Sequence, residues 1–378
     1  MLTVHGLARL ALVVLATTML PACGTMYLAQ AARGQWQVLH AREPIEKVIA
    51  DRKTPDELRT RLTEVRAARQ FASRELGLPD NSSYRTYADV KRTYVVWNVV
   101  AAPEFSVSPQ RWCFPIAGCV AYRGYFTEAG ANKFAASLRK RGFDVVVGGV
   151  PAYSTLGKLS DPVLNTMLGY GDSELAAIIF HELSHQVVYV AGDSEFNEAF
   201  AVTVEETGLE RWLKARGHES DLARYQTRRQ RQRQYLALFT RTRAQLAVLY
   251  AEKISVDEMR QRKQATLTAL ANDIRALDKK FGGRSGYDEW IDAGLNNAHL
   301  ASVATYYDCV PGFARLLALH NGNLPQFYAT VRDLTKRPRA ERHALLCTTP
   351  EPEKTEPPPN PEPAGPRATT SQSMTDLR

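Results

Sequence analysis

The sequence predicts an α+β fold that is mostly helical, with a small sheet ahead of a buried helix and a long helical hairpin after it. Three observations predict this class. Residues 92–101 are rich in β-branched and aromatic residues, which favour strands. Residues 175–190 are apolar on both sides of the motif HELSH (residues 181–185), which indicates a buried helix. Residues 224–280 consist almost entirely of helix-forming residues.

The elements before the motif read as helices followed by strands. Residues 27–38 have helical spacing. Residues 54–57 form a capping box of Thr54 and Glu57 with Pro55 at the first helical position, and its helix is expected to run to about residue 76. Strands are expected next at residues 84–87, 92–101 and 120–126. A helix at 127–141 and a strand at 143–149 follow them.

Two successive helices carry a candidate metal site. The HELSH helix is expected to begin at Asp172, and a turn at residues 191–194 ends it and caps a second helix over residues 195–215. Glu198 lies in the first turn of that second helix. A short turn lets the two helices cross with their ligands facing each other.

The residue types and spacing of the motif suit one zinc ion. Positions i and i+4 of a helix share a face, so His181 and His185 can face one ion, and Glu198 adds a carboxylate. Two imidazoles and one carboxylate leave an open fourth position, which is typical of hydrolytic zinc sites. Glu182 is then placed to act as the general base towards a water molecule.

The alternative is an amphipathic helix that carries two surface histidines by coincidence. The apolar flanks argue against it, because buried histidines and a buried glutamate need partners. We therefore predict a cofactor of one Zn²⁺ held by His181, His185 and Glu198.

The motif HELSHQ followed by NEAFA (residues 197–201) resembles the gluzincin metallopeptidases, most closely their aminopeptidase branch. The wider chain is similar to a family of bacterial lipoproteins described as putative aminopeptidases, through residues 112–119, 152–157 and 295–302. This resemblance covers most of residues 25–345. It implies a zincin-like metallopeptidase domain that takes a peptide or protein substrate.

The resemblance also suggests further site residues. Gluzincins commonly supply a tyrosine or histidine, from downstream of the third ligand, to stabilise the oxyanion. Tyr306 is the first candidate, and Tyr307 and His299 are the others. Asn297 is a candidate for binding the substrate backbone, or else caps a helix. Tyr153 is a candidate edge-strand residue beside an extended substrate, or else belongs to plain sheet structure.

The chain departs from the gluzincin pattern at two places. An acidic residue commonly follows the glutamate ligand by four positions and bonds back to a ligand histidine, but here that position is Val202. Glu205 and Glu206, two turns further on, are the candidates to replace it. The aminopeptidase branch has an edge-strand glutamate that binds the substrate's free amine, and residues 147–153 contain none.

The N-terminus reads as a bacterial lipoprotein signal peptide over residues 1–22. An apolar stretch, residues 10–20, precedes a small residue and Cys23, which resembles a lipobox. Lipid on Cys23 would tether the protein to a membrane, facing the periplasm. Gly24 stands where resembling inner-membrane lipoproteins carry aspartate, which favours the outer membrane. The alternative is an ordinary secretory signal with a free Cys23.

Four cysteines remain once Cys23 is set aside, and an even number in an oxidising compartment suggests disulfides. Cys113 and Cys119 are the first expected pair because they close a short loop, and Cys309 with Cys347 is the remainder. A metal site at Cys113 and Cys119 is the alternative.

The remaining chain divides into segments of different character. We expect one segment over residues 23–207, a helical hairpin over 208–285, a C-terminal helical part over 286–347 that closes the site, and a disordered Pro/Glu-rich tail over 348–378.

The net charge is +8, with basic runs such as residues 228–233. These runs suit a solvated helix face or anionic lipid headgroups. Nucleic acid is not an expected partner. Oligomeric state is left open.

The leading interpretation is a lipid-anchored zinc peptidase of the cell envelope, an aminopeptidase by resemblance. One alternative is an endopeptidase that acts on envelope proteins. The other is a non-catalytic lipoprotein that uses the same fold as a binding module, which the intact Glu182 argues against.

Overall fold

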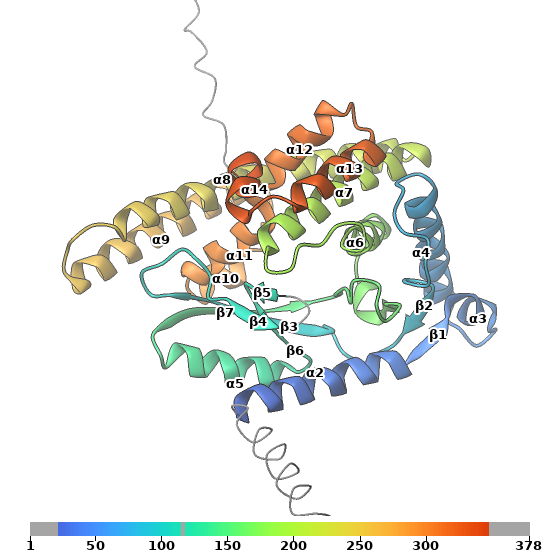
Figure 1. Cartoon of the computed structure of the whole chain (residues 1–378), viewed down its shortest axis with the longest axis horizontal. Coiled ribbons are helices and arrows are strands. Elements are labelled where there is room, and N and C mark those ends of the chain that lie inside the picture. The colour runs from blue at the N-terminus through green and yellow to red at the C-terminus, as the bar shows by residue number, and fades with distance from the viewer. Residues whose placement is uncertain (1–21, 115–117, 348–378) are drawn as a thin grey trace, which may run out of the picture. The chain divides into compact units, whose positions relative to one another are not determined.

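Three small sheets surrounded by helices make up the computed structural model of the chain, which describes residues 22–114 and 118–347 (Figure 1). The fold is therefore α+β and mostly helical. Residues 1–21 of the expected signal peptide and the expected tail lie outside the described residues. No helix in the part of the chain that the structure describes is both long and apolar enough to span a bilayer.

The N-terminal part consists of α2 (Ala22–His40), the short helix α3 (Ile45–Ala50) and α4 (Asp56–Arg74). The expected capping box is wrong. Pro55 occupies the N-cap position without a side-chain cap, and the Thr54 hydroxyl donates instead to the carbonyl of Val48. Leu62, Val65 and other residues on the inner face of α4 are buried, which gives this helix its place against the core.

The largest sheet is antiparallel and has the strand order β6-β3-β7, with β6 at Arg123–Tyr125, β3 at Val96–Pro103 and β7 at Phe143–Val150. The helix α5 (Glu128–Arg139) packs on one side of it, and α11 (Asn297–Tyr307) lies on the other side (Figure 1). Thr127 caps α5 by accepting a hydrogen bond from the backbone of Gly130. The sheet thus connects α11 to the N-terminal half.

Two smaller sheets complete the β structure. In one, β2 (Thr86–Ala88) pairs antiparallel with β1 (Arg42–Pro44) and parallel with β8 (Val163–Leu164). The other is the hairpin of β4 (Trp112–Phe114) and β5 (Gly118–Val120). Strands at 86–88, 96–103 and 143–150 agree with the predicted positions to within a few residues.

The centre of the fold is the pair α6 (Asp172–Ser184) and α7 (Ser194–Ala215), which follows a turn of 3₁₀ helix, η1 (Asn165–Met167). The pair packs against α4 and against α12 (Val310–Leu319), α13 (Leu324–Thr335) and α14 (Arg339–Leu346). Gly208 permits the close approach of α7 to α6, because a Cβ there would lie 2.9 Å from the ring of Phe180. The shared core contains Phe180, Phe196, Phe200, Phe313 and Phe327.

The helices α8 (Glu219–Leu249) and α9 (Val256–Phe281) form a long hairpin arm with a second hydrophobic core, to which α10 (Asp288–Asp292) contributes Trp290. Three of the arginines in the basic run at 228–233 contact other residues of the protein. Arg228 pairs with Glu174, Arg229 pairs with Glu206, and Arg231 lies over the ring of Phe281.

Candidate metal centre

Three side chains from α6 and α7 bring possible metal ligands together. The ligand atoms of His181, His185 and Glu198 all lie within 4.8 Å of one another. One oxygen of Glu198, Oε2, lies 3.3 Å from Nε2 of His181 and 3.8 Å from Nε2 of His185. The structure therefore places the three predicted ligands around one point, and this point is largely removed from solvent.

The helix geometry explains the convergence. His181 lies in the last turn of α6, and His185 is the residue at its C-cap, still in a helical conformation, so the i and i+4 relation is kept. The helix ends at Ser184, earlier than its apolar sequence suggested, and the side chain of Asn197 binds the backbone of Val190 in the turn that follows. The Asn197 amide accepts from the Val190 N–H and donates to the Val190 carbonyl, both at 2.8 Å.

The asparagine of NEAFA therefore folds the turn that brings Glu198 to the histidines. Sequence reasoning quoted Asn197 in the motif without giving it this role. The turn at residues 191–194 was expected to cap α7. Asp193 occupies the N-cap without a side-chain cap, and its carboxylate binds Arg342 and His343.

Glu205 takes the place of the acidic residue that is missing at Val202. Its Oε2 lies 3.0 Å from Nδ1 of His181, so His181 is held on both sides by carboxylates of α7. Glu198 and Glu205 are seven residues apart and so lie on one face of that helix. Glu206 points elsewhere and pairs with Arg229 of α8.

Burial and neighbouring charge set the protonation of the three candidate ligands. Burial acts to lower the pKa of His181, but hydrogen bonds with Glu198 and Glu205 outweigh it and raise this pKa well above its usual value. Burial lowers the pKa of His185 to about 4, so its ring is neutral. Burial opposes the shift at Glu198, whose pKa is lowered by the hydrogen bond with His181 and the charges of both histidines.

The donor set fits a divalent cation. The ring of His185 is neutral, its Nε2 faces the carboxylate, and its Nδ1 is buried with no hydrogen-bond partner among the described residues. Nε2 of His181 and Oε2 of Glu198 lie 3.3 Å apart at the place where a cation would bind, and the raised pKa of His181 favours a proton on its ring, which metal binding would displace. Two imidazoles and a carboxylate form a set that borderline metals such as zinc accept.

Another group of possible ligands, Asp193, Glu195 and His343, does not fit a cation. Arg339 and Arg342 pair with Asp193, and Arg111 and Arg339 pair with Glu195, so the carboxylates are already neutralised by guanidinium groups. Cys309 and Cys347, which lie beside His343, are joined to each other as a disulfide. The α6–α7 site is thus the better candidate.

Glu182 lies in the same buried environment. Burial, opposed by His181 and reinforced by Glu198, raises the pKa of the Glu182 carboxyl to about 7. A carboxyl group with such a pKa can both accept and return a proton near neutral pH.

Tyr84 is a neighbour of Glu182 that sequence reasoning missed. Burial and then the nearby charge of Glu182 raise the pKa of Tyr84 well above its usual value. Its side chain is buried, its hydroxyl has no partner among the described residues, and its φ is +62°, which is uncommon for a tyrosine. The loop that holds it is fixed by Gln186, which bonds Asn81 and Ser83. Only the glutamine of HELSHQ hinted at this arrangement.

Two further tyrosines lie near enough to Glu198 for its charge to act on their hydroxyl groups. Burial and then the charge of Glu198 raise the pKa of Tyr306 on α11, and the same two causes raise the pKa of Tyr122, which follows β5. Both side chains keep some exposed surface. Tyr306 therefore lies beside the candidate centre, whereas the hydroxyl of Tyr307 accepts a hydrogen bond from Gln232 of α8.

Three other predicted residues serve the fold. β7 ends at Val150, so Tyr153 is not part of the edge strand, and its hydroxyl donates to Gln35 of α2. Asn297 is fully buried and bonds Tyr250 and the carbonyls of Pro103 and Glu104. His299 packs on Trp290, accepts from the backbone of Asn296, and has its pKa lowered by burial to about 4. These contacts attach α2 and α11 to their neighbours.

The remaining predicted residues are the cysteines. Cys113 is joined to Cys119 across the β4–β5 hairpin, and Cys309 is joined to Cys347, which connects the start of α12 to the end of α14. No metal is needed at Cys113 and Cys119. Cys23 falls in the first turn of α2, where its side chain lies outside what the structure describes.

Comparison with known proteins gives one match. A family model described as "Putative aminopeptidase" matches residues 26–346, which is most of the chain. No curated protein and no solved structure matches. The matched range contains every residue of the candidate centre and supports a peptidase.

Proposed function

The chain belongs to this aminopeptidase family, and we propose that it is a zinc-dependent peptidase with a zincin-like domain whose metal centre consists of His181, His185 and Glu198. The observation that carries the proposal is the convergence of their ligand atoms within 4.8 Å. Glu182 adjoins His181 in the chain, and the charges of His181 and Glu198 act on its carboxyl group. Among the described residues the group contains no fourth histidine, cysteine or carboxylate ligand, so a coordination position is left for water, as a hydrolytic site requires.

The chain's own residues divide the work of hydrolysis. A zinc ion, when bound, would polarise the scissile carbonyl and acidify a water molecule. Glu182 takes the proton from the attacking water and passes it to the leaving amine. Glu205 holds the ring of His181 in the orientation that ligation needs, through its 3.0 Å contact with Nδ1. Tyr306 is the group that would donate to the developing oxyanion.

The test compares metal content with turnover. The purified chain with its disulfides is assayed for zinc by atomic absorption and for cleavage of aminoacyl substrates and of internally quenched, amino-blocked peptides. Glu182→Gln should keep zinc and lose at least about a hundredfold of the turnover. His185→Ala should lose both. Glu174→Gln, the same change two turns earlier on α6, should keep both. A zinc-loaded chain that cleaves no peptide would contradict the proposal and favour a binding module.

The same assay decides between the two kinds of peptidase. Cleavage that requires a free amino terminus supports the aminopeptidase. Cleavage of blocked peptides at internal bonds identifies an endopeptidase, for which the lack of an acidic residue in residues 147–153 is the motivating observation.

We further propose that Cys23 is acylated, which would anchor the enzyme to a bacterial membrane, facing the periplasm, with Gly24 favouring the outer membrane. Mass spectrometry of the mature N-terminus tests this proposal. A diacylglyceryl adduct on Cys23 that is lost in Cys23→Ser supports it. A mature chain with an unmodified Cys23 would contradict it.

A further inference from the structure

The outward face of α2 is apolar, although the helix is firmly attached to the rest of the chain. Met26, Leu28 and Trp36 are 75%, 55% and 56% exposed. Ala29 and Ala32 lie between them on the same face and are also exposed. Three large exposed apolar side chains on one helix form a patch rather than single scattered residues.

The opposite face explains why this patch cannot turn inward. The side-chain amide of Gln30 accepts from the backbone of Phe126 and donates to the carbonyl of Gly124. Gln35 accepts from Tyr153, and Val38 is buried in the main core. Gly34 lies so close to Phe126 that a Cβ would overlap the phenyl ring. The helix is therefore fixed in its rotation, and its outward side remains uncovered by any described residue.

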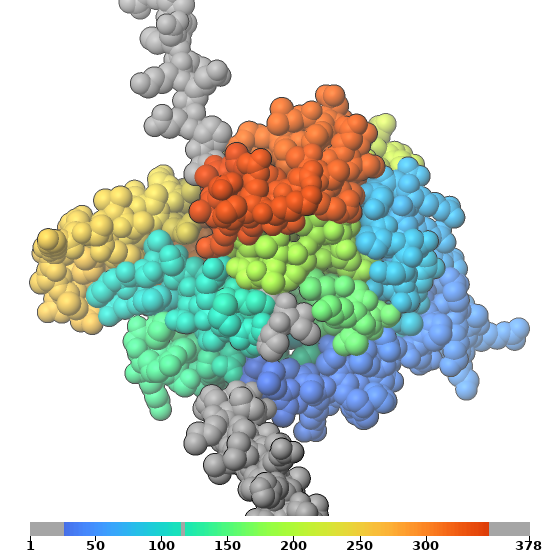
Figure 2. Space-filling model, viewed as in Figure 1, coloured from blue at the N-terminus to red at the C-terminus, as the bar shows by residue number. Residues whose placement is uncertain are grey.

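Charge and position indicate what covers the patch. Residues 22–40 contain no aspartate or glutamate, and Arg33, the one arginine, lies on the exposed face. An apolar face with a basic residue at its border and a tryptophan is typical of helices that lie in a bilayer interface. Cys23, the residue proposed to carry the lipid, lies in the first turn of this helix. The blue surface of α2 lies at the lower margin of the described chain in Figure 2.

We propose that α2 lies on a phospholipid bilayer, with Met26, Leu28 and Trp36 inserted among the lipid headgroups and upper acyl chains and Arg33 at the level of the phosphates. The argument uses the proposed anchor at Cys23 but not the proposed hydrolysis. A lipid group on one residue would attach the protein to the bilayer at one point and leave its orientation unfixed. A second contact along α2 would fix its orientation, and the Gln35–Tyr153 bond connects this helix to the loop before the metal-centre helices.

The experiment uses Trp36 as a depth reporter. The full acylated chain is reconstituted in vesicles of phosphatidylethanolamine and phosphatidylglycerol that carry bromine at a shallow acyl position, and the fluorescence quenching that Trp36→Phe removes is assigned to Trp36. We expect strong quenching by the brominated lipid and weak quenching by aqueous acrylamide. Met26→Gln/Leu28→Gln should lose most of the lipid quenching. The matched control Val248→Gln/Leu319→Gln replaces two residues that are 69% and 78% exposed on α8 and α12 and should lose none.

Other results overturn the proposal. Quenching of Trp36 by acrylamide alone would mean that the patch faces water. Protection from both quenchers would mean that a protein, such as a second copy of the chain, covers it. Flotation of the chain with the vesicles reports on the anchor separately, so a chain that floats without lipid quenching of Trp36 refutes the helix contact while leaving the anchor intact. Zinc content, measured on the same samples, reports on the metal centre.

Discussion

The turn between α6 and α7 and the arm formed by α8 and α9 are stabilised in opposite ways. The turn spans fewer than ten residues and is held by buried charges and by elements that carry the two disulfides. The arm spans more than sixty residues and is held by an apolar core that it shares with α10 and α11 and by ion pairs at its surface. The difference shows that the chain concentrates its strongest constraints at the turn that sets Glu198 against the two histidines.

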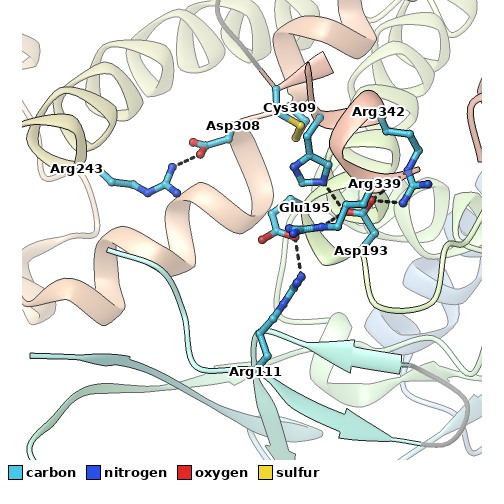
Figure 3. The surroundings of a disulfide bond; sticks show 10 residues. Arg111, Asp193, Glu195, Arg243, Asp308, Cys309, Arg339 and Arg342 are labelled. Atoms are coloured by element: carbon cyan, nitrogen blue, oxygen red, sulfur yellow. Dashed lines mark hydrogen bonds and ion pairs between the residues drawn. A yellow bond between two sulfur atoms is a disulfide. The ribbon is translucent and has the colours of Figure 1, made fainter. Parts of the chain in front are cut away.

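Two structures brace the turn from opposite sides. On the α14 side, Arg342 lies 2.6 Å and His343 lies 2.7 Å from the buried carboxylate of Asp193, and Cys347 at the end of α14 is tied to Cys309 (Figure 3). On the sheet side, Arg111 donates to the carbonyl of Gly192 and pairs with Glu195.

The β4–β5 hairpin completes the sheet-side brace. Its Gly118 lies against Gly192 so closely that a Cβ would overlap the backbone nitrogen. The disulfide between Cys113 and Cys119 spans this hairpin. Both disulfides therefore lie in elements that contact the same turn.

Removal of the Cys309–Cys347 disulfide should have the largest effect. The bond closes 38 residues, so Cys309→Ser/Cys347→Ser should lower the free energy of unfolding by about 4 kcal/mol. Zinc affinity should fall as well, because α14 loses its fixed position over Asp193. Urea unfolding and chelator competition measure the two effects. The Cys113–Cys119 disulfide spans only six residues, so its removal in the control variant Cys113→Ser/Cys119→Ser should lower the free energy of unfolding by about 2 kcal/mol. Equal losses for both pairs would contradict the prediction.

Asp193→Asn tests the buried charges alone. The variant leaves Arg342 and His343 without their carboxylate, and breaking a buried pair in this way costs about 3 kcal/mol. Glu195→Gln, in the more exposed neighbouring pair, should cost less than about 1 kcal/mol. The free energies of unfolding of the two variants are measured side by side, and equal losses would contradict the greater importance of the buried charges.

The wild-type chain should also show the effect of Asp193 as a pH dependence. Burial acts to raise the pKa of Asp193, but bonds to His343 and Arg342 lower it from 3.8 to about 2. A lowered folded-state pKa stabilises the protein above pH 3.8 and loses that contribution as the pH falls towards 2. The contribution is about 2.5 kcal/mol. Asp193→Asn should lack this part of the acid transition, and an unchanged transition would contradict the assignment.

Glu205→Gln should affect the metal more than the fold. The amide still fills the space beside His181 but does not carry the charge that makes its ring a strong ligand. Loss of such a supporting carboxylate typically costs 10- to 100-fold in metal affinity, so we expect about that fall in chelator competition. The free energy of unfolding of the metal-free chain should change little. Glu206→Gln, which pairs with Arg229 rather than with a ligand, should leave the metal affinity unchanged.

The sequence predicted the contacts of the site between residues close together in the chain and did not predict those between residues far apart. The i and i+4 spacing of His181 and His185 and the short gap to Glu198 predicted the convergence, because helix geometry fixes those relations. The apolar run to residue 190 predicted too long a helix: α6 ends at Ser184, and the turn after it is held at Val190 by Asn197, a contact made by a side chain of the next helix. Asp193 and Arg342 are 149 residues apart, and no local pattern signals their contact.

The same reasoning explains other contacts that the sequence did not signal. Tyr153 and Asn297 were candidates for substrate binding on the strength of their neighbours in sequence, and in the structure tertiary contacts with Gln35 and Tyr250 use their polar atoms. Tyr84 gave no signal because its left-handed backbone depends on the loop that Gln186 holds. Local spacing is thus informative where one or two adjacent helices make the site and fails where distant loops complete it.

Loss of an ion pair in the α8–α9 arm should have the smallest effect on stability. Arg241 of α8 and Asp273 of α9 form an ion pair at 2.5 Å, and both side chains are about half exposed. Solvent and salt screen such a pair, so Arg241→Ala should lower the free energy of unfolding by less than about 1 kcal/mol and leave zinc affinity unchanged. The charge pair at Asp193 differs from this one chiefly in burial. If Arg241→Ala destabilised the chain as strongly as Asp193→Asn, or weakened zinc binding, the arm would be coupled to the metal centre as tightly as the turn is.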